Sequence, residues 1–296
     1  MKILVAEDDV ISCIALEKSI KDWGYDVVTA NNGKQAWQII KSSKIRLCIL
    51  DWGIPGIDGV ELCHKIRQEY QPYISKYIYI ILITGRDLKN DVIKGLSAGA
   101  DDYVTKPFDF TELKIRIQNA EQRIKLEDIR IKEATHDSLT KLWNRKKILE
   151  FLEEEIERGS RLNHPTGVIM VGIDKFKKIN DSYSRSTGDK ILSEVSSRLQ
   201  KSIRRYDKIG RYSGDKMLAV IPNGTCANIK PIVSRMLLSI DKKIFKTDTG
   251  QFNITISIGG TSTEKAPPSS VRALLKACDK ALCSAKTQGK SQFIIT

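Results

Sequence analysis

The sequence has no long hydrophobic run, and its longest apolar stretch, residues 78–84, is short enough for one buried strand. A membrane-spanning helix needs about 18 or more apolar residues in a row, so we expect no membrane segment and no membrane partner. A secretory leader is not expected either, because acidic residues begin at Glu7, before any apolar core could form. We therefore predict a cytoplasmic protein.

Patterns typical of zinc sites and disulfide frameworks are also absent. The six cysteines contain no CxxC pair, and the three histidines stand apart from one another and from any nucleophile pattern. We expect the cysteines to be small core residues in a reducing compartment. Catalysis by an isolated histidine is not indicated.

Excess positive charge is missing from the first part of the chain. Residues 1–110 carry 14 Lys+Arg and 15 Asp+Glu, whereas residues 136–296 carry 29 and 16 and account for the net charge of +13. The 296 residues amount to two domains at a usual size of roughly 150 residues each. A basic second domain suits nucleic acid, anionic lipid or an anionic small ligand, although lysines that only solvate a surface would give the same count.

Five short apolar runs alternate with helix-period segments in the first half: residues 3–6, 27–29, 47–50, 78–83 and 103–105. This alternation predicts an α/β fold with a doubly wound parallel sheet, whose ligand site lies at the carboxyl ends of the strands. Reactive polar residues stand at four of these ends: Glu7, Asp8, Asp51, Thr84 and Lys106. Helix capping would explain one or two of them, but not the whole set.

Residues 1–120 resemble the receiver domain of two-component response regulators, which has a flavodoxin-like fold. The resemblance implies that Asp51 is the phosphoacceptor and that a sensor histidine kinase is the partner. It also implies a Mg²⁺ site made by Glu7, Asp8, Asp51 and the backbone carbonyl of Gly53. Clustered carboxylates favour a divalent cation, which neutralises charge during phosphoryl transfer.

Three further receiver positions follow from the same resemblance. Thr84 is the hydroxyl that turns toward the phosphoryl group, and Tyr103 is the switch residue that follows it inward. Lys106 is the lysine that pairs with the phosphate, and in this family the peptide before the following proline, here Pro107, is usually cis.

Apolar residues at three- and four-residue steps predict one long helix over residues 111–135, overlapping the last receiver helix. The stripe comprises Leu113, Ile117, Ala120, Ile124, Ile131 and Ala134. Such a helix is about 37 Å long, more than a small domain needs. We expect it to project as a coiled-coil linker and to pair with a second copy in a homodimer; alternatively, the whole stripe packs against the receiver.

Residues 136–296 contain six motifs that resemble, in order and spacing, the GGDEF domain of diguanylate cyclases: HDSLTKLWNRKK, GVIMVGIDKFKKIND, STGDKIL, RRYDKIGRYSGDKM, ITISIGG and ACDKALCSAKTQGK. The resemblance implies an α+β fold with a mostly antiparallel sheet flanked by helices. It also implies a reaction that joins two GTP molecules into cyclic di-GMP.

The residues of this domain depart from the family at the metal. The signature reads Ser-Gly-Asp-Lys-Met at 213–217, so Lys216 replaces an acidic metal ligand, and Gly172 stands where the family has the other one. Asp215 matches the catalytic position and is vestigial without a metal. Because phosphoryl transfer depends on that metal, we expect no cofactor in this site and no cyclase activity.

Nucleotide-binding positions are retained. Asn180 and Asp189 match the residues that read the guanine edge, unless they are merely helix caps. Lys286 and Lys290 match the basic pair that holds the phosphates, and Lys216 could join them in holding GTP without a metal. The alternative is that Lys216 extends into solvent.

The segment from Arg204 to Asp207 matches the RxxD site at which active relatives bind cyclic di-GMP. An arginine there can pair with a phosphate, and the aspartate can accept hydrogen bonds from guanine. A solvated charged turn would have the same sequence.

The sequence thus predicts a phosphorylation-controlled response regulator. Its GGDEF output is expected to be non-catalytic and to bind cyclic di-GMP, GTP or a protein partner. One alternative is an active diguanylate cyclase, and another is a nucleic-acid-binding output. The second is disfavoured because no aromatic stacking surface or recognition-helix motif is seen.

Overall fold

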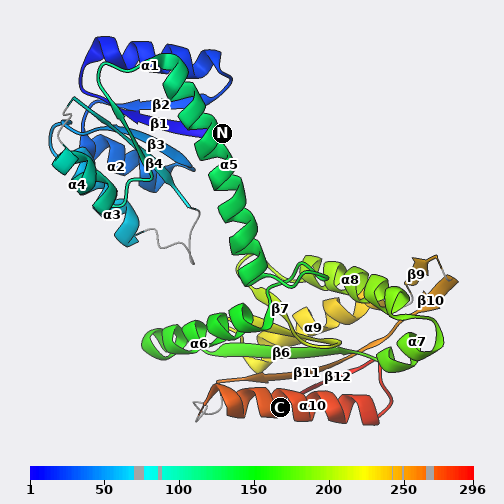
Figure 1. Ribbon diagram of the computed structural model, residues 1–296. Coiled ribbons are helices and arrows are strands. Elements are labelled where there is room, and N and C mark those ends of the chain that lie inside the picture. The colour runs from blue at the N-terminus through cyan, green and yellow to red at the C-terminus, as the bar shows by residue number, and fades with distance from the viewer. Residues whose placement is uncertain (70–76, 86–88, 242, 249, 265–269) are drawn as a thin grey trace. The chain divides into compact units, whose positions relative to one another are not determined.

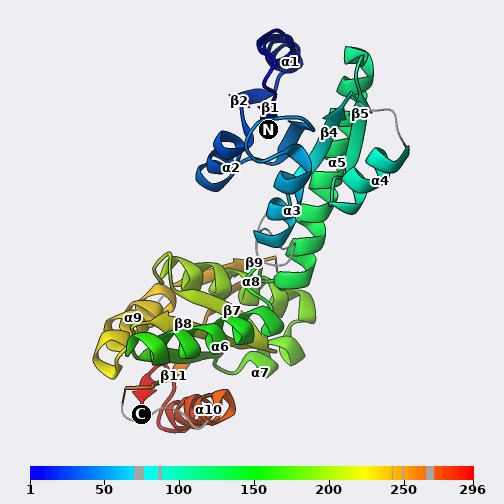
Figure 2. The same cartoon turned by 90° about the vertical axis from the view of Figure 1, so that its left-hand side faces the viewer.

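The computed structural model describes residues 1–69, 77–85, 89–241, 243–248, 250–264 and 270–296 (Figures 1 and 2). The chain divides into two compact units, Met1–Lys132 and Glu133–Thr296. In the described part of the chain, no helix is both long enough and apolar enough to cross a membrane.

The first unit contains a five-stranded sheet in which every neighbouring pair is parallel, in the order β2-β1-β3-β4-β5. The strands are β1 Lys2–Ala6, β2 Asp26–Ala30, β3 Leu47–Asp51, β4 Tyr79–Thr84 and β5 Asp102–Thr105. This confirms the predicted doubly wound sheet. The strand order departs from the chain order at β1 and β3, so their carboxyl ends flank the crevice where ligands bind in such folds.

Helices cover both faces of this sheet (Figure 1). The helices are α1 Val10–Asp22, α2 Gly33–Ser42, α3 Gly59–Glu69, α4 Lys89–Ser97 and α5 Phe110–Thr135. Residues of α1 and α5 form one core with the sheet, and residues of α2 and α3 form the other. Burial on both faces explains why the three inner strands, β1, β3 and β4, are nearly continuous apolar runs and do not alternate with polar residues.

The apolar stripe of α5 is divided between two environments. Leu113, Ile117, Ala120 and Ile124 are buried in the receiver core, whereas Ala134 is exposed. The expectation that these first four residues form a coiled-coil seam is therefore wrong. A three- and four-residue spacing indicates one apolar face and does not identify what covers it.

Polar contacts hold α5 to the receiver beyond the buried part of the stripe. The Arg46 guanidinium donates to both carboxylate oxygens of Asp128, at 2.8 and 2.9 Å, and its Nε donates to the Tyr77 carbonyl. The Tyr25 hydroxyl donates to Glu121 at 3.0 Å. The helix therefore belongs to the receiver as far as Asp128.

The second unit contains a five-stranded sheet in the order β12-β11-β6-β8-β7 and a separate hairpin of β9 and β10. Its strands are β6 Thr166–Ile173, β7 Lys208–Ser213, β8 Lys216–Pro222, β9 Ile244–Thr247, β10 Gly250–Asn253, β11 Ile256–Ser262 and β12 Phe293–Ile295. Within the described strands, β11 and β12 pair in parallel and the other pairs are antiparallel. The predicted α+β fold with a mostly antiparallel sheet is confirmed.

The helices of the second unit also cover two faces. They are α6 Arg145–Leu162, α7 Phe176–Ser182, α8 Arg185–Lys201, α9 Cys226–Ile240 and α10 Val271–Thr287. Residues of α8 and α9 pack in one core, and residues of α6 and α10 pack in the other. Strand β6 lies in the middle of the sheet, is buried along its whole length, and brings Gly172 to the edge at which α7 begins.

The six cysteines are free thiols, but only part of the expectation for them holds. Cys48, Cys63 and Cys278 are buried, whereas Cys283 is exposed and the other two are half-buried. Cys283 was expected in the core because its helix, α10, is apolar on one face, and the residue lies on the opposite face.

Candidate functional site

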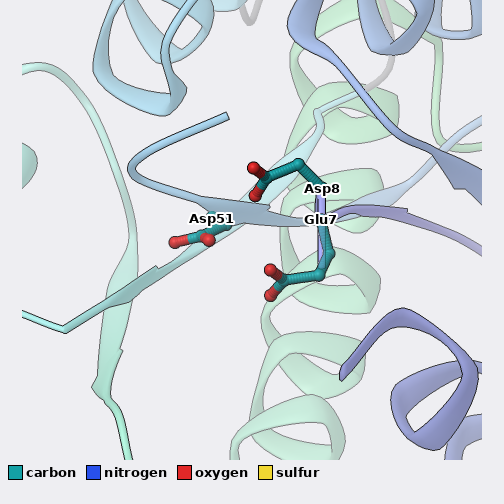
Figure 3. A group of neighbouring side chains, drawn as sticks. All are labelled: Glu7, Asp8 and Asp51. Carbon is teal, nitrogen blue, oxygen red and sulfur yellow. The ribbon is translucent and has the colours of Figure 1, made fainter. Parts of the chain in front are cut away.

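The receiver brings three carboxylates together where β1 and β3 end (Figure 3). Glu7 and Asp8 follow β1, and Asp51 is the last residue of β3. Oxygen atoms of all three lie within 4.8 Å of one another. They meet because β1 and β3 are neighbouring parallel strands whose carboxyl ends lie at the same edge.

Lys106 connects two of these carboxylates. Its Nζ donates to Glu7 Oε2 at 2.7 Å and to Asp51 Oδ2 at 3.0 Å. Burial raises the pKa of Glu7, which is 2% exposed. Burial also acts to lower the pKa of Lys106, but its hydrogen bonds to Glu7 and Asp51 outweigh this effect and raise the pKa.

The receiver cluster fits a magnesium ion. Three carboxylates face one ammonium, so negative charge remains in excess, and hard oxygen ligands are those that Mg²⁺ prefers. Asp8 is exposed and Asp51 is half-buried, so a cation can reach them from solvent. Gly53, two residues beyond Asp51, is exposed in the adjoining loop.

Thr84 and Tyr103 lie on the neighbouring strands. Thr84 ends β4, is 1% exposed, and its carbonyl accepts from the Lys106 N–H at 2.7 Å. Tyr103 in β5 is half-buried and packs against the core beneath α2 and α3. The peptide between Lys106 and Pro107 is cis. The receiver residues predicted from sequence therefore come together at one edge of the sheet, with Tyr103 beside them.

The two positions of the second unit that the resemblance identifies as lost metal ligands, Gly172 and Lys216, hold or lie beside ammonium groups. Gly172 and Lys216 are direct partners in the ladder of β6 and β8. A Cβ atom added to Gly172 would lie 2.7 Å from Lys286 Nζ, and that Nζ lies 3.5 Å from Asp215 Oδ2. The Lys286 ammonium therefore occupies the place into which a side chain at position 172 would project.

Lys216 also has a carboxylate partner. It forms an ion pair with Asp279 of α10, and this hydrogen bond raises the pKa of Lys216. The alternative in which Lys216 extends alone into solvent is therefore wrong. Two ammonium groups here match two carboxylates, and the nearby Asp174 accepts bonds from Thr255, Ser257 and Ser291. Each of these three carboxylates therefore already has a partner within its own chain.

The two residues matched to guanine recognition do not cap helices. The Ser184 side chain caps α8 by accepting from the Thr187 N–H, and Asn180 lies inside α7. Asn180 Oδ1 is buried and has no hydrogen-bond partner among the described residues, and Asp189 is exposed. Gly188 lets Asn180 approach, because a Cβ there would lie 1.8 Å from Asn180 Oδ1.

In the RxxD segment, the aspartate and the first arginine have different surroundings. Asp207 is 4% exposed, its Oδ2 accepts from the Arg204 N–H at 2.8 Å, and burial raises its pKa. Its Oδ1 has no partner in the described part of the chain. The Arg204 side chain is exposed and donates to the Tyr206 hydroxyl at 2.6 Å. A fully solvated turn is therefore wrong for Asp207, which closes the turn from inside.

The structure separates the two lysines matched to phosphate binding. Lys286 turns to Asp215, whereas Lys290 lines a pocket with Lys175 and Lys178 of the α7 region. Sequence reasoning missed Lys175 and Lys178. The signal was the lysine-rich string Lys-Phe-Lys-Lys at 175–178, but a sequence does not show which of its lysines share a pocket.

Two family models match the chain. "Response regulator receiver domain" covers residues 3–118, and "Diguanylate cyclase, GGDEF domain" covers residues 134–292. The chain is 26% identical over 266 residues to "Response regulator PleD" of Caulobacter vibrioides, a match that covers 87% of this chain and 58% of PleD. It is 32% identical over 159 residues to "Uncharacterized protein YtrP" of Bacillus subtilis, covering 54% of this chain and 26% of YtrP.

Solved structures of GGDEF-domain proteins have the fold of the second unit. Diguanylate cyclase SiaD from Pseudomonas aeruginosa, solved in complex with its activator SiaC, matches at 27% identity with a TM-score of 0.53, covering 63% of this chain and 72% of SiaD. The coiled coil and GGDEF domain of DgcB from Caulobacter crescentus was solved in complex with c-di-GMP. It matches at 23% identity with a TM-score of 0.56, covering 64% of this chain and 100% of the DgcB chain. The chain spans little more than half the length of PleD.

Proposed function

This chain belongs to the GGDEF family of diguanylate cyclase domains and is a response regulator with a receiver ahead of that output, and we propose that the output is non-catalytic. In this proposal, phosphorylation of Asp51 controls whether the second unit binds a guanine nucleotide or a protein partner. The residues of each unit support the proposal separately.

One observation carries the proposal of a non-catalytic output. The Lys286 ammonium lies 2.7 Å from the position of a Cβ at Gly172, where the family resemblance puts a metal-binding carboxylate. A cation would meet positive charge there, and Lys216 adds a second ammonium across the ladder. Without metal ligands, Asp215 has no means of preparing a hydroxyl for attack on a triphosphate.

The receiver residues support a phosphoryl-transfer role. A receiver domain implies a kinase partner, and Asp51 would accept the phosphoryl group on a carboxylate oxygen. Glu7, Asp8 and Asp51 would hold Mg²⁺, which supplies charge neutralisation for that transfer. Lys106, already donating to Asp51, would pair with the phosphate, and the Thr84 hydroxyl lies on the adjacent strand.

For the output, we propose cyclic di-GMP at Arg204 and Asp207 as the first ligand and GTP at Asn180 and Asp189 as the second. The exposed guanidinium of Arg204 is free to pair with a phosphate if it leaves the Tyr206 hydroxyl. The buried and unpartnered Asn180 Oδ1 supports the second site, because an unsatisfied acceptor can receive a donor from a guanine edge.

Product formation tests the non-catalytic proposal directly. The full chain is incubated with GTP, excess Mg²⁺ and beryllofluoride, and the mixture is analysed by mass spectrometry. We expect no cyclic di-GMP. Detected product, lost in an Asp215→Asn variant, would restore the cyclase.

Calorimetry tests the cyclic di-GMP site. Arg204→Ala should weaken binding by about ten- to a hundredfold, since it removes one charge-assisted contact. Arg205→Ala is the matched control, because Arg205 is the exposed neighbour and has no assigned role. Equal binding by Arg204→Ala and wild type would place the ligand elsewhere.

We also propose that phosphorylation promotes a homodimer through the receiver and α5. Ile115, Leu126 and Ile129 are 54%, 56% and 51% exposed on that helix, and covering them would be favourable. Light scattering of the full chain at micromolar concentration should give twice the monomer mass with beryllofluoride. Leu126→Lys with Ile129→Lys should abolish that increase, and a persistent monomer in the wild type would contradict the proposal.

A further inference from the structure

A pocket of 430 Å³ lies between α7, the β9–β10 hairpin with the segment that follows it, and the loop after α10. Pockets that take small ligands have volumes of about 300–1,000 Å³, so this one suits a ligand of mononucleotide size. Neither Asn180, Asp189, Arg204 nor Asp207 lines it. It is lined by Asp174, Lys175, Lys178, Ile179, Ser182, Tyr183, Phe252, Asn253, Ile254, Thr255, Gly289, Lys290 and Ser291.

The charge in this pocket is one-sided. Lys175, Lys178 and Lys290 line it, and none of the three has an ion-pair partner in the described part of the chain. The one carboxylate in the lining is Asp174, which is 6% exposed. Three ammonium groups against one carboxylate leave positive charge in excess, so an anion placed among the lysines would be favoured.

The Asp174 carboxylate is held by hydrogen bonds to neutral groups and makes no ion pair with the three lysines in the described part of the chain. Its Oδ1 accepts from the Ser257 hydroxyl at 2.8 Å, and its Oδ2 accepts from the Thr255 hydroxyl at 2.7 Å and the Ser291 N–H at 3.3 Å. These bonds tie the segment before α7 to the start of β11 and to the loop after α10. The lysines therefore stand on a rigid base.

The backbone at the pocket is held in an uncommon conformation. Lys175, Lys290 and Ser291 have φ angles of 56°, 62° and 46°, in the left-handed region that non-glycine residues rarely adopt. Strained residues of this kind gather at ligand sites, where the surrounding structure holds them in place. Here the strain presents two of the three lysines to one cavity.

One wall of the pocket is aromatic. The rings of Tyr183 and Phe252 pack edge to face, with centroids 4.8 Å apart and an interplanar angle of 87°. Tyr183 is 54% exposed, so its ring is available to a planar ligand. A π-face beside ammonium groups is the combination that binds a nucleobase and its phosphate without reading the base.

We propose that this pocket binds an organic phosphate that carries a planar ring, of mononucleotide size, with little preference for the base. The phosphate lies among Lys175, Lys178 and Lys290, and the ring stacks on Tyr183. No metal is required, because the three ammonium groups supply the positive charge. This site shares Lys290 with the phosphate-holding pair matched from the sequence, but it uses none of Asn180, Asp189, Arg204 and Asp207.

Calorimetry of the full chain with AMP, GMP and ribose 5-phosphate, in EDTA, tests the proposal. AMP and GMP should bind within a few-fold of each other, and ribose 5-phosphate about tenfold or more weakly, because stacking of one base contributes about 1–3 kcal/mol. Tyr183→Ala should reduce this difference between AMP and ribose 5-phosphate, and Tyr183→Phe should retain it.

Charge variants locate the phosphate. Lys175→Gln with Lys178→Gln should weaken AMP binding by about ten- to a hundredfold. Lys177→Gln is the matched control, because Lys177 is exposed on the same helix and does not line the pocket. Unchanged AMP binding by the double variant would overturn the proposal, as would equal binding of ribose 5-phosphate and AMP, or no AMP binding at millimolar concentration.

Two further variants separate this site from the proposed function. Asn180→Ala with Asp189→Ala, and Arg204→Ala, should leave AMP binding unchanged. If they abolish it, AMP occupies one of the other sites and this proposal fails. If cyclic di-GMP does not bind but AMP still does, the ligand proposed for the output fails and the pocket remains.

Discussion

The two units bring ammonium groups and carboxylates together in different proportions. In the receiver, Lys106 is the one ammonium among Glu7, Asp8 and Asp51. In the second unit, Lys216 faces Asp279, and Lys286 faces Asp215. In the receiver the carboxylates outnumber the ammonium group three to one, whereas these two pairs of the second unit are matched one to one.

Under the proposal of a non-catalytic output, this difference means that acids in a site are not enough for metal chemistry. Asp215 and Asp279 are carboxylates like the receiver residues, but each is paired one to one with an ammonium group of its own chain. A magnesium ion would have to displace an ammonium group that the fold holds in place. The ratio of carboxylates to ammonium groups therefore separates the two units better than the presence of aspartate does.

The largest effect is expected at Asp51. Asp51→Asn should abolish phosphorylation by acetyl phosphate and Mg²⁺, because an amide oxygen cannot replace the carboxylate as the nucleophile. Phos-tag electrophoresis measures this as the loss of the shifted band. Asp22→Asn, at an exposed position on α1, should shift like the wild type. An equal shift in Asp51→Asn would show that another residue accepts the phosphoryl group.

The next largest effect is expected on the affinity of the receiver for a divalent metal ion. Mn²⁺ titration of the full chain, followed by electron paramagnetic resonance, should give one site per chain. Asp8→Ala should weaken that site by at least about tenfold, because one carboxylate of the cluster is lost. A second site of similar affinity, unaffected by Asp8→Ala, would break the comparison between the two units.

A smaller effect, a gain of weak Mn²⁺ binding, is expected when carboxylates are placed at positions 172 and 216 of the second unit. Gly172→Asp with Lys216→Glu adds two carboxylates on facing strands, removes one ammonium and frees Asp279. The double variant should bind a second, weaker Mn²⁺ ion. Gly172→Asp alone should pair with Lys286, whose flexible end can move aside, and remain at one ion. A double variant that also stays at one ion would mean that geometry, and not charge, excludes the metal.

The smallest effect is expected on stability. Asp215→Asn should change the free energy of unfolding by less than about 1 kcal/mol, because its pair with Lys286 is partly exposed, at 28% and 30%. Urea denaturation measures the change, with Asp279→Asn as the parallel variant. A loss of several kcal/mol would mean that the pair stabilises the fold as well as setting the local charge.

Sequence reasoning predicted the site best where a reactive residue directly follows or ends a predicted strand. Glu7, Asp51 and Thr84 could be placed at a shared edge because parallel strands bring their carboxyl ends together, and the structure places them there. The division of α5 could not be predicted, because periodicity shows that Ile117 and Ala134 share a stripe but not that the receiver covers only the first.

The second unit was harder to predict for a different reason. The absence of carboxylates at positions 172 and 216 is readable from the sequence, but the group that fills the space is not. Lys286 is 114 residues away from Gly172 along the chain, and only the packing of α10 against β6 brings them together. The pocket around Lys175 was missed because three separate segments supply its lysines, its aromatic wall and its carboxylate.

The short segment before α6 determines where a fragment that contains only the second unit has to begin. Residues His136 and Trp143 form a β-bridge, Trp143 forms another with Gly210 of β7, and Arg211 donates to both Asp137 and the Gly214 carbonyl. A fragment that starts at 145, where α6 begins, would leave β7 with an uncovered edge and Arg211 without its carboxylate. One that starts near 134 keeps both contacts. As a separable module, the output therefore begins before its first long helix.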